Sequence, residues 1–299
     1  MMHRATHPER ALAAKILIWM QTQSVLKGNY FHHGGIRLQA SQNVTVFNRQ
    51  DTFIDISSPK ERRITVGRVD CLEAAESLQV VGFSKVAVLS MANSNKPGGH
   101  VKKGADSQEE DLFRRTDISR QTERFLRGEH YPCSDSEPVV MVQPGVTIIR
   151  GPKKDGYPFL NDIPEVITLI SVAVQKKPAK YIDTVTGKSL YGDIKDKEDM
   201  RRHIRLVLHA ILKTDCTAVV LSALGCGLDG HPPEEVALMF KREIYRVGEK
   251  LPFIFFAVFD ENQAPAPTGN FEIFERILVA PDAADPNWRS AKYVFYHAV

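Results

Sequence analysis

Residues 217–227 read TAVVLSALGCG, an apolar run that ends in a glycine turn. Beyond this turn, residues 232–235 read PPEE, and proline followed by acidic residues is typical of the first turn of a helix. Residues 253–259 form a second apolar run after this helix. Strand, loop, helix and strand in this order form a βαβ unit, which implies parallel strands and a right-handed crossover. The sequence therefore predicts an α/β fold.

A second glycine loop follows another apolar run. Residues 85–91 read KVAVLSM, and residues 97–110 read PGGHVKKGADSQEE. Because ligands of open α/β sheets bind beyond the carboxyl ends of the strands, we expect both glycine loops to face one cleft. The remaining predictions are helices at residues 8–27, 70–78, 107–118 and 197–212, strands at 36–40, 44–47, 146–150 and 165–174, and a polar surface segment at 176–197.

The composition is that of an ordinary globular protein. The chain has 299 residues, of which 43% are hydrophobic and 25% charged, and its formal net charge is +3. This charge permits an anionic ligand without requiring nucleic acid. We expect a single domain over residues 1–299, with an N-terminal extension over about residues 1–60, a core over about 61–280 and a C-terminal tail at 281–299. Four basic residues bracket the first glycine loop, and we interpret them as a solvated face, with attraction of a polyanion as the alternative: Lys102, Lys103, Arg114 and Arg115.

The cysteines and apolar segments argue against two classes of protein. Cys71, Cys133, Cys216 and Cys226 form no CxxC pair, and no Cys/His cluster has the spacing of a zinc site, so no metal is expected. No segment approaches the ~20 consecutive apolar residues that span a membrane. We therefore expect no membrane partner and a cytoplasmic, reducing location.

Gln108, Glu109 and Glu110 allow two interpretations. With Ser107 they form the pattern of a capping box, in which Ser107 caps a helix and Glu110 reaches back from the first turn. The glycine loop just upstream, which a cap does not need, favours a catalytic role. Adjacent helical residues point about 100° apart, so the two carboxylates cannot flank one bond, and one must act while the other orients. A helix N-terminus favours the carboxylate form, so burial must outweigh the helix dipole if Glu110 is to donate a proton.

The second loop, residues 225–230 (GCGLDG), has three interpretations. Its glycines let backbone N–H groups approach a diphosphate at the start of the following helix. Its spacing also fits a nicotinamide-dinucleotide fingerprint, with Asp260 as the acidic residue after the next strand, or a plain tight turn. Because Cys226 has no evident His partner, we expect a small buried filler there rather than a nucleophile.

Several motifs occur in one order along most of the chain, and together they are more specific than any one alone. They are Gly28-Asn29-Tyr30, the segment VDCLEAA at residues 69–75, Pro97-Gly98-Gly99, Gln108-Glu109-Glu110 and Leu224-Gly225-Cys226-Gly227. This order resembles the bacterial-type (microbial) poly(ADP-ribose) glycohydrolase family. The resemblance implies a macrodomain-like three-layer α/β/α sandwich with a mixed sheet and an N-terminal helical extension.

The resemblance also implies an activity and a set of roles. Members hydrolyse the O-glycosidic ribose–ribose bond of poly(ADP-ribose) and release ADP-ribose, without metal or cofactor. By matching position, Glu110 is the general acid and then the base, and Glu109 holds ribose hydroxyls. Substrate-binding positions are Gln108, Gly98, Gly99 and His100 in the first loop, Gly225, Cys226, Gly227 and Leu228 around the diphosphate, and Asp70 near the adenine. The expected partners are ADP-ribose or poly(ADP-ribose) on modified proteins, or ADP-ribosylated nucleic acid.

Three positions depart from the family's pattern. His100 replaces the third glycine of the first loop, where histidine tolerates a left-handed backbone less readily. Ser90 replaces an asparagine, and Leu228-Asp229 replaces an aromatic that stacks on the ligand. These departures leave two alternatives open, a mono-ADP-ribosyl hydrolase of protein or nucleic acid and a catalytically silent ADP-ribose-binding macrodomain. The fingerprint at residues 225–230 leaves a dinucleotide oxidoreductase as a third.

Overall fold

The computed structural model describes residues 7–27, 44–48, 64–125, 131, 138–160, 165–259 and 269–279. The chain forms two compact units, which we call the first unit (residues 1–51 and 89–174) and the second unit (residues 52–88 and 175–299). No helix in the described ranges is long and apolar enough to cross a membrane. Several predictions lie outside the described residues, namely the strand at 36–40, Gly28-Asn29-Tyr30, Cys133, Asp260 and the tail at 281–299.

The seven main strands confirm the expected mixed α/β sheet. Their order is β1-β4-β5-β3-β8-β9-β2. In the first unit, β4 (Val140–Thr147) pairs antiparallel with β1 (Thr45–Phe47) and with β5 (Val166–Val172). In the second unit, β8 (Ala218–Leu221) pairs parallel with β9 (Phe253–Ala257), which in turn pairs parallel with β2 (Ile64–Gly67). Strand β3 (Val86–Met91) pairs parallel with β8 and crosses from the second unit into the first at Leu89.

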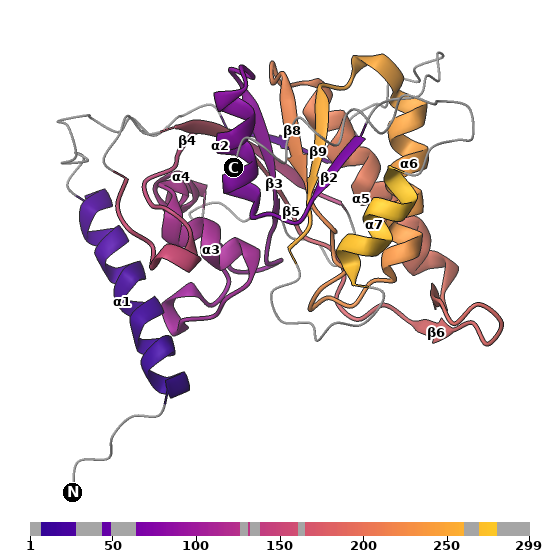
Figure 1. The fold of residues 1–299 in the computed structure, drawn as a ribbon, viewed down its shortest axis with the longest axis horizontal. Coiled ribbons are helices and arrows are strands. Elements are labelled where there is room, and N and C mark those ends of the chain that lie inside the picture. The colour runs from indigo at the N-terminus through magenta and orange to yellow at the C-terminus, as the bar shows by residue number, and fades with distance from the viewer. Residues whose placement is uncertain are drawn as a thin grey trace, which may run out of the picture. The chain divides into compact units, whose positions relative to one another are not determined.

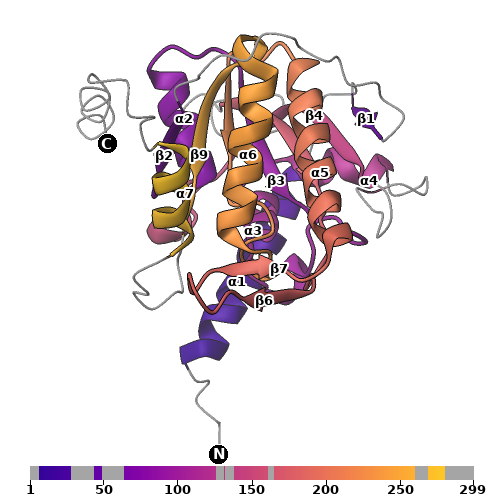
Figure 2. The same cartoon turned by 90° about the vertical axis from the view of Figure 1, so that its right-hand side faces the viewer.

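The second unit is a three-layer arrangement built around the predicted βαβ unit. Helix α2 (Cys71–Val80) lies on one side of its strands, and α5 (Ile194–Leu212), α6 (Pro233–Val247) and α7 (Asn270–Leu278) lie on the other (Figures 1 and 2). A short 3₁₀ turn, η3 (Gly248–Lys250), follows α6. The ring of Phe256 packs against Phe240 at 5.2 Å and Phe274 at 5.8 Å, so α6 and α7 share a buried contact with β9. The predicted order of strand, helix and parallel strand is confirmed.

The first unit carries α1 (His7–Lys27), α3 (Gln108–Arg115) and α4 (Ile118–Phe125), with 3₁₀ turns η1 (Val101–Lys103) and η2 (Lys153–Asp155). Helix α1 packs on η1 and α3, where Trp19 and Phe113 have ring centroids 6.3 Å apart. One helix was predicted over residues 107–118, and its predicted end is wrong, because α3 ends at Arg115 and α4 begins at Ile118. The chain turns at Thr116, whose backbone is extended and forms a bridge with Ile148, and Asp117 accepts the N–H of Thr147 at 2.7 Å.

The segment predicted as a polar surface excursion, residues 176–197, contains further structure. It forms an antiparallel hairpin of β6 (Lys180–Ile182) and β7 (Ser189–Tyr191), with Gly187 in a left-handed conformation near the turn. Helix α5 then begins earlier than expected, because Asp193 caps it by accepting the N–H of Lys195. Tyr181 and Ile182 are exposed, in keeping with the surface position that was predicted.

Candidate active site

The first glycine loop connects β3 to α3 and contains two residues that must be glycine. Gly98 and Gly99 have φ of +70° and +51°, the left-handed region that side chains disfavour. A Cβ atom on Gly98 would lie 2.5 Å from the ring of Phe113, and one on Gly99 would overlap Oε1 of Glu110. The backbone of Gly98 and Gly99 therefore packs directly against side chains of α3, and any side chain at these two positions would prevent this contact.

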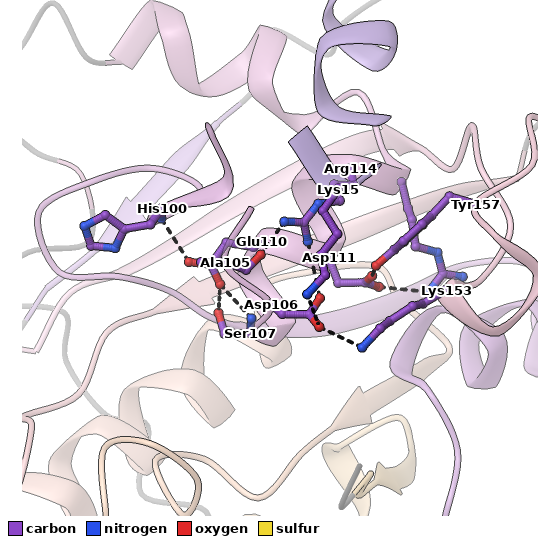
Figure 3. A network of polar contacts seen from close by, with 11 residues as sticks. Lys15, His100, Ala105, Asp106, Ser107, Glu110, Asp111, Arg114, Lys153 and Tyr157 are labelled. Carbon is purple, nitrogen blue, oxygen red and sulfur yellow. Dashed lines mark hydrogen bonds and ion pairs between the residues drawn. The ribbon is translucent and has the colours of Figure 1, made fainter. Parts of the chain in front are cut away.

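Glu110 is buried and joins both ends of the segment that leads from the glycines to α3. Its Oε1 accepts the N–H of His100 at 2.9 Å. Its Oε2 accepts the N–H of Ser107 at 2.8 Å and also the Ser107 hydroxyl (Figure 3). The contacts of the predicted capping box are thus present. The same carboxylate holds residues 100 and 107 together, so the cap is part of the loop's architecture.

His100 adopts an ordinary backbone conformation at the position where the family's pattern has glycine. Its φ is −111°, so the concern about a left-handed histidine is wrong. The left-handed turn is completed by the two glycines before it, and the chain has returned to a negative φ when it reaches His100. The imidazole is exposed and points away from Glu110 (Figure 3).

Glu109 is 2% exposed and points to a different set of donors. It accepts the N–H of Gly98 at 2.9 Å, the N–H of Asn93 at 2.7 Å and the hydroxyl of Tyr131. Burial raises the pKa of Glu109 to about 7, although these three hydrogen bonds lower it, and the charge of Glu110 raises it further. Sequence reasoning missed Tyr131, because no motif or spacing links it to a carboxylate 22 residues away.

Gln108 ties the start of α3 to the end of β3. Its Nε2 donates to the carbonyl oxygen of Leu89 at 2.8 Å, and its Oε1 accepts the N–H of Met91 at 2.8 Å. These bonds to strand backbone place the two glutamates just beyond the carboxyl end of β3, where ligands of α/β sheets bind. The predicted contact between Gln108 and substrate stays a prediction.

Arg114 and Arg115 are fully buried, so their interpretation as a solvated face is wrong. Helix α1 packs on α3, and the arginines at the end of α3 face protein instead of solvent. Arg114 donates through Nη2 to the carbonyl oxygen of Ala105, and Arg115 pairs through Nη1 with Asp111 at 3.1 Å. Lys102 and Lys103 are exposed, as that interpretation predicted.

The second glycine loop lies in the second unit and is closed by backbone bonds. His231 N–H donates to the Gly225 oxygen at 2.9 Å, and Gly230 N–H donates to the Gly227 oxygen at 3.0 Å. The buried His231 ring, which sequence reasoning missed, holds the end of this loop through Tyr191 Oη and the Gln175 oxygen, each at 2.7 Å. A Cβ atom on Gly227 would meet nothing within 4 Å among the described residues, so this stretch of backbone is open to an approaching group.

Two residues of the second unit have roles that the structure makes clear. Cys226 is buried, and its Sγ lies 3.5 Å from the Leu224 oxygen, which agrees with its interpretation as a filler. Asp70 is the N-cap of α2, where its Oδ1 accepts the N–H groups of Leu72 and Glu73 at 3.0 and 3.1 Å. Leu228 is 89% exposed. Contacts of these residues with adenine or diphosphate stay predictions.

The structure therefore brings six predicted residues together in the first unit: Gly98, Gly99, His100, Gln108, Glu109 and Glu110. The other predicted positions, Asp70 and residues 225–228, belong to the second unit. Among the residues that the structure describes, no three His, Cys, Asp or Glu side chains are grouped so as to hold a metal ion. The chemistry that this arrangement offers is that of two neighbouring buried carboxylates with different hydrogen-bond partners.

Comparisons with known proteins point to one family. Residues 21–141, which include the first glycine loop and both glutamates, match the family described as Microbial-type PARG, catalytic domain. The resemblance to this family is thereby confirmed over these residues. No curated protein sequence matches the chain.

Solved structures share the fold. Poly(ADP-ribose) glycohydrolase from Thermomonospora curvata, bound to the inhibitor ADP-HPD, is 21% identical with a TM-score of 0.66, over 88% of this chain and 99% of that chain. Poly(ADP-ribose) glycohydrolase from Deinococcus radiodurans, in complex with ADP-ribose, is 24% identical with a TM-score of 0.54, over 72% of this chain and 83% of that chain. The expected α/β fold with a mixed sheet is therefore the fold of these enzymes.

Proposed function

We propose that this chain is a microbial-type poly(ADP-ribose) glycohydrolase, which hydrolyses the O-glycosidic ribose–ribose bond of poly(ADP-ribose) and releases ADP-ribose. The observation that carries the proposal is the pair of buried carboxylates, Glu109 and Glu110, held by backbone N–H groups of a glycine loop at the end of β3. This pair lies within the residues that match the family. The binding of ADP-ribose by the Deinococcus radiodurans enzyme supports ADP-ribose as the product.

In the proposed reaction, the two glutamates have separate roles. Glu110 donates its proton to the ribose oxygen that leaves, as the glycosidic bond breaks and positive charge develops at the anomeric carbon. Glu110 then accepts a proton from water, and the water oxygen forms the new bond to that carbon, which restores the acid. Glu109, oriented by Gly98, Asn93 and Tyr131, holds ribose hydroxyls and keeps the sugar in place.

The remaining contacts of the substrate are part of the same proposal. Within residues 225–228, backbone N–H groups other than that of Cys226, which donates to the Ala223 oxygen at 3.0 Å, hold the diphosphate, and the exposed backbone at Gly227 supports this role. Asp70 contacts the adenine. The reaction needs neither metal nor cofactor, because the anchored diphosphate and the two carboxylates supply positioning, proton transfer and charge stabilisation.

The first test is the release of ADP-ribose by the wild type and by Glu110→Gln, measured in parallel. We expect release by the wild type and a loss of at least about 100-fold in the variant, because glutamine cannot transfer the proton. Binding of ADP-ribose, measured by calorimetry, should be retained. Glu198→Gln is the matched control, since it makes the same change at an exposed glutamate of α5 outside the loop and should leave release unchanged. Full activity of Glu110→Gln would refute the assignment of the acid.

The substrate in this assay decides between the proposal and its alternatives. One observation favours a narrower activity, because the exposed Leu228 stands where the resemblance places a stacking aromatic. Release from mono-ADP-ribosylated acceptors alone would identify a mono-ADP-ribosyl hydrolase. ADP-ribose binding without release from either substrate would identify a catalytically silent binding protein.

A further inference from the structure

The four residues before α3 determine where the donors of Glu110 lie. Gly104 ends the 3₁₀ turn η1, and Ala105 and Asp106 lead to Ser107, the N-cap of α3. Both the N–H and the hydroxyl of Ser107 donate to Oε2 of Glu110. Asp106 immediately precedes Ser107. The contacts of the Asp106 side chain therefore help to fix the peptide whose N–H binds the Glu110 carboxylate.

Asp106 is the centre of an ion-pair cluster drawn from three elements (Figure 3). Its Oδ2 accepts from Lys15 of α1 at 2.8 Å and from Lys153 of η2 at 2.7 Å. Its Oδ1 lies 3.6 Å from Nη1 of Arg114 in α3. Arg114 also donates to the carbonyl oxygen of Ala105, so the same guanidinium holds the peptide before Asp106.

The cluster is partly shielded from solvent. Exposed side-chain fractions are 26% for Asp106, 20% for Lys15, 36% for Lys153 and 0% for Arg114, so the Lys15 and Arg114 contacts are screened less than an open surface pair and the Lys153 contact is screened more than these two. Burial raises the pKa of Asp106, but the hydrogen bonds and charges of Lys15 and Lys153 lower it more, and the net pKa is below its ordinary value. Asp106 is therefore charged at neutral pH.

Helix α1 makes a second contact with the same segment. Gly104 has φ of +77°, and a Cβ atom there would lie 2.6 Å from Cδ1 of Leu12 and 3.0 Å from its carbonyl oxygen. The backbone of α1 thus lies against one end of the segment, while Lys15 binds Asp106 near the other end. Trp19 packs on Phe113, which in turn contacts Gly98, so α1 supports the glycine loop as well.

We propose that Asp106 is a positioning residue for Glu110, and that the N-terminal helix α1 supports the active site through the ion pair of Lys15 with Asp106. The inference rests on the proposed function, because it assigns Glu110 as the acid. The cluster holds Ser107 in the orientation that fixes one carboxylate oxygen of Glu110. Its loss displaces the carboxylate from the reacting bond without removing any group that touches the substrate.

The experiment compares Lys15→Met and Asp106→Asn with the wild type in steady-state ADP-ribose release. We expect kcat to fall roughly tenfold in each variant, because a small displacement of a catalytic group lowers the rate of the chemical step. KM and the Kd for ADP-ribose should stay within about twofold of the wild type. Lys15→Arg, which keeps the charge, should recover most of kcat. Lys85→Met is the matched control, since it breaks the exposed ion pair with Asp215 in the second unit and should leave kcat unchanged.

Each outcome separates this inference from the proposed function. Wild-type release with an unchanged kcat in Lys15→Met and Asp106→Asn would overturn the inference alone. A parallel loss of kcat and ADP-ribose affinity would also overturn it, because that pattern indicates general damage to the fold. If Asp106→Asn fails to fold, Lys15→Met and Lys15→Arg decide the question by the same measurement. No release by the wild type would overturn the proposed function, and the inference with it.

Discussion

At the residue scale, two neighbouring glutamates occupy different environments although the sequence places them side by side. Glu109 accepts from the loop and from Tyr131, whereas Glu110 accepts from the two ends of the segment 100–107. Adjacent positions at a helix start point in different directions, so each carboxylate meets its own donors. This divergence supports the proposed division of roles, in which Glu109 orients the sugar and Glu110 transfers the proton.

The raised pKa of Glu109 predicts how stability depends on pH. Folding raises this pKa from an ordinary value near 4.3 to about 7, so the wild type loses stability as the pH rises through this window and levels off above it. In Glu109→Gln this loss is absent. The difference in free energy of unfolding, Glu109→Gln minus wild type, should therefore be roughly 2–3 kcal/mol larger at about pH 8 than at about pH 5. Urea unfolding at both pH values measures the change.

The comparison between the two pH values removes any constant effect of the substitution on hydrogen bonding. Val80→Ala is the control and should show the same pH dependence as the wild type, because this side chain is 80% exposed and carries no ionisable group. A difference between Glu109→Gln and the wild type that does not change with pH would show that Glu109 titrates alike in the folded and unfolded states.

At the element scale, the starts of α3 and α2 have observed capping contacts at residues that were also predicted to bind or cleave the substrate. The capping box of α3 was one interpretation of residues 107–110 and catalysis was the other, yet the contacts of Glu110 show the cap within the loop that carries the candidate site. Helix α2 starts at Asp70, which was predicted near the adenine and is observed as an N-cap. The observed cap and the predicted adenine contact require different properties of the Asp70 side chain, so substitutions can distinguish them.

Substitutions of Asp70 separate the cap from the ligand contact. Asp70→Ala should lower the free energy of unfolding by about 1 kcal/mol, because the N–H groups of Leu72 and Glu73 lose their acceptor. Asp70→Asn keeps an acceptor and should unfold like the wild type. If Asp70 also contacts the adenine, Asp70→Asn weakens ADP-ribose binding at unchanged stability. Urea unfolding and calorimetry report the two effects, and wild-type stability in Asp70→Ala would contradict the cap's contribution.

At the scale of the whole molecule, the predicted ligand contacts are divided between two compact units. The glutamates and first glycine loop belong to the first unit, and Asp70 and residues 225–228 belong to the second. A ligand that binds only the folded protein stabilises it in proportion to the logarithm of its concentration. Thermal unfolding therefore reports binding independently of turnover.

We expect ADP-ribose at about 100 times its Kd to stabilise the protein by about 2.7 kcal/mol, which for a chain of this size raises Tm by roughly 5 °C. Glu110→Gln should show a similar shift, because the proposed acid contributes to turnover more than to binding. Differential scanning calorimetry provides the measurement. Stabilisation by a nicotinamide dinucleotide, with none by ADP-ribose, would favour the oxidoreductase interpretation of residues 225–230.

Much of the fold and part of the candidate site follow from local signals. Apolar runs predict β3, β8 and β9, and the proline and acids after residue 231 predict the start of α6. Glycines at 98 and 99, followed by Gln108-Glu109-Glu110, predict the candidate site itself. These signals are readable because each depends on residues close together in the chain.

Other features were decided by tertiary structure alone. Lys15 and Lys153 are 91 and 47 residues from Asp106, and Tyr131 is 22 residues from Glu109, so no periodicity or spacing connects them. Arg114 and Arg115 are buried by residues distant in sequence: Thr22 of α1 donates to the Arg114 oxygen at 2.9 Å, and Arg115 Nε lies 3.4 Å from the Arg150 oxygen. The raised pKa of Glu109 follows from its burial, a property of the packed molecule. The sequence by itself determined which residues are candidates for the chemistry. Packing determined the orientation of both glutamates and the raised pKa of Glu109, because these depend on neighbours that only folding brings into contact.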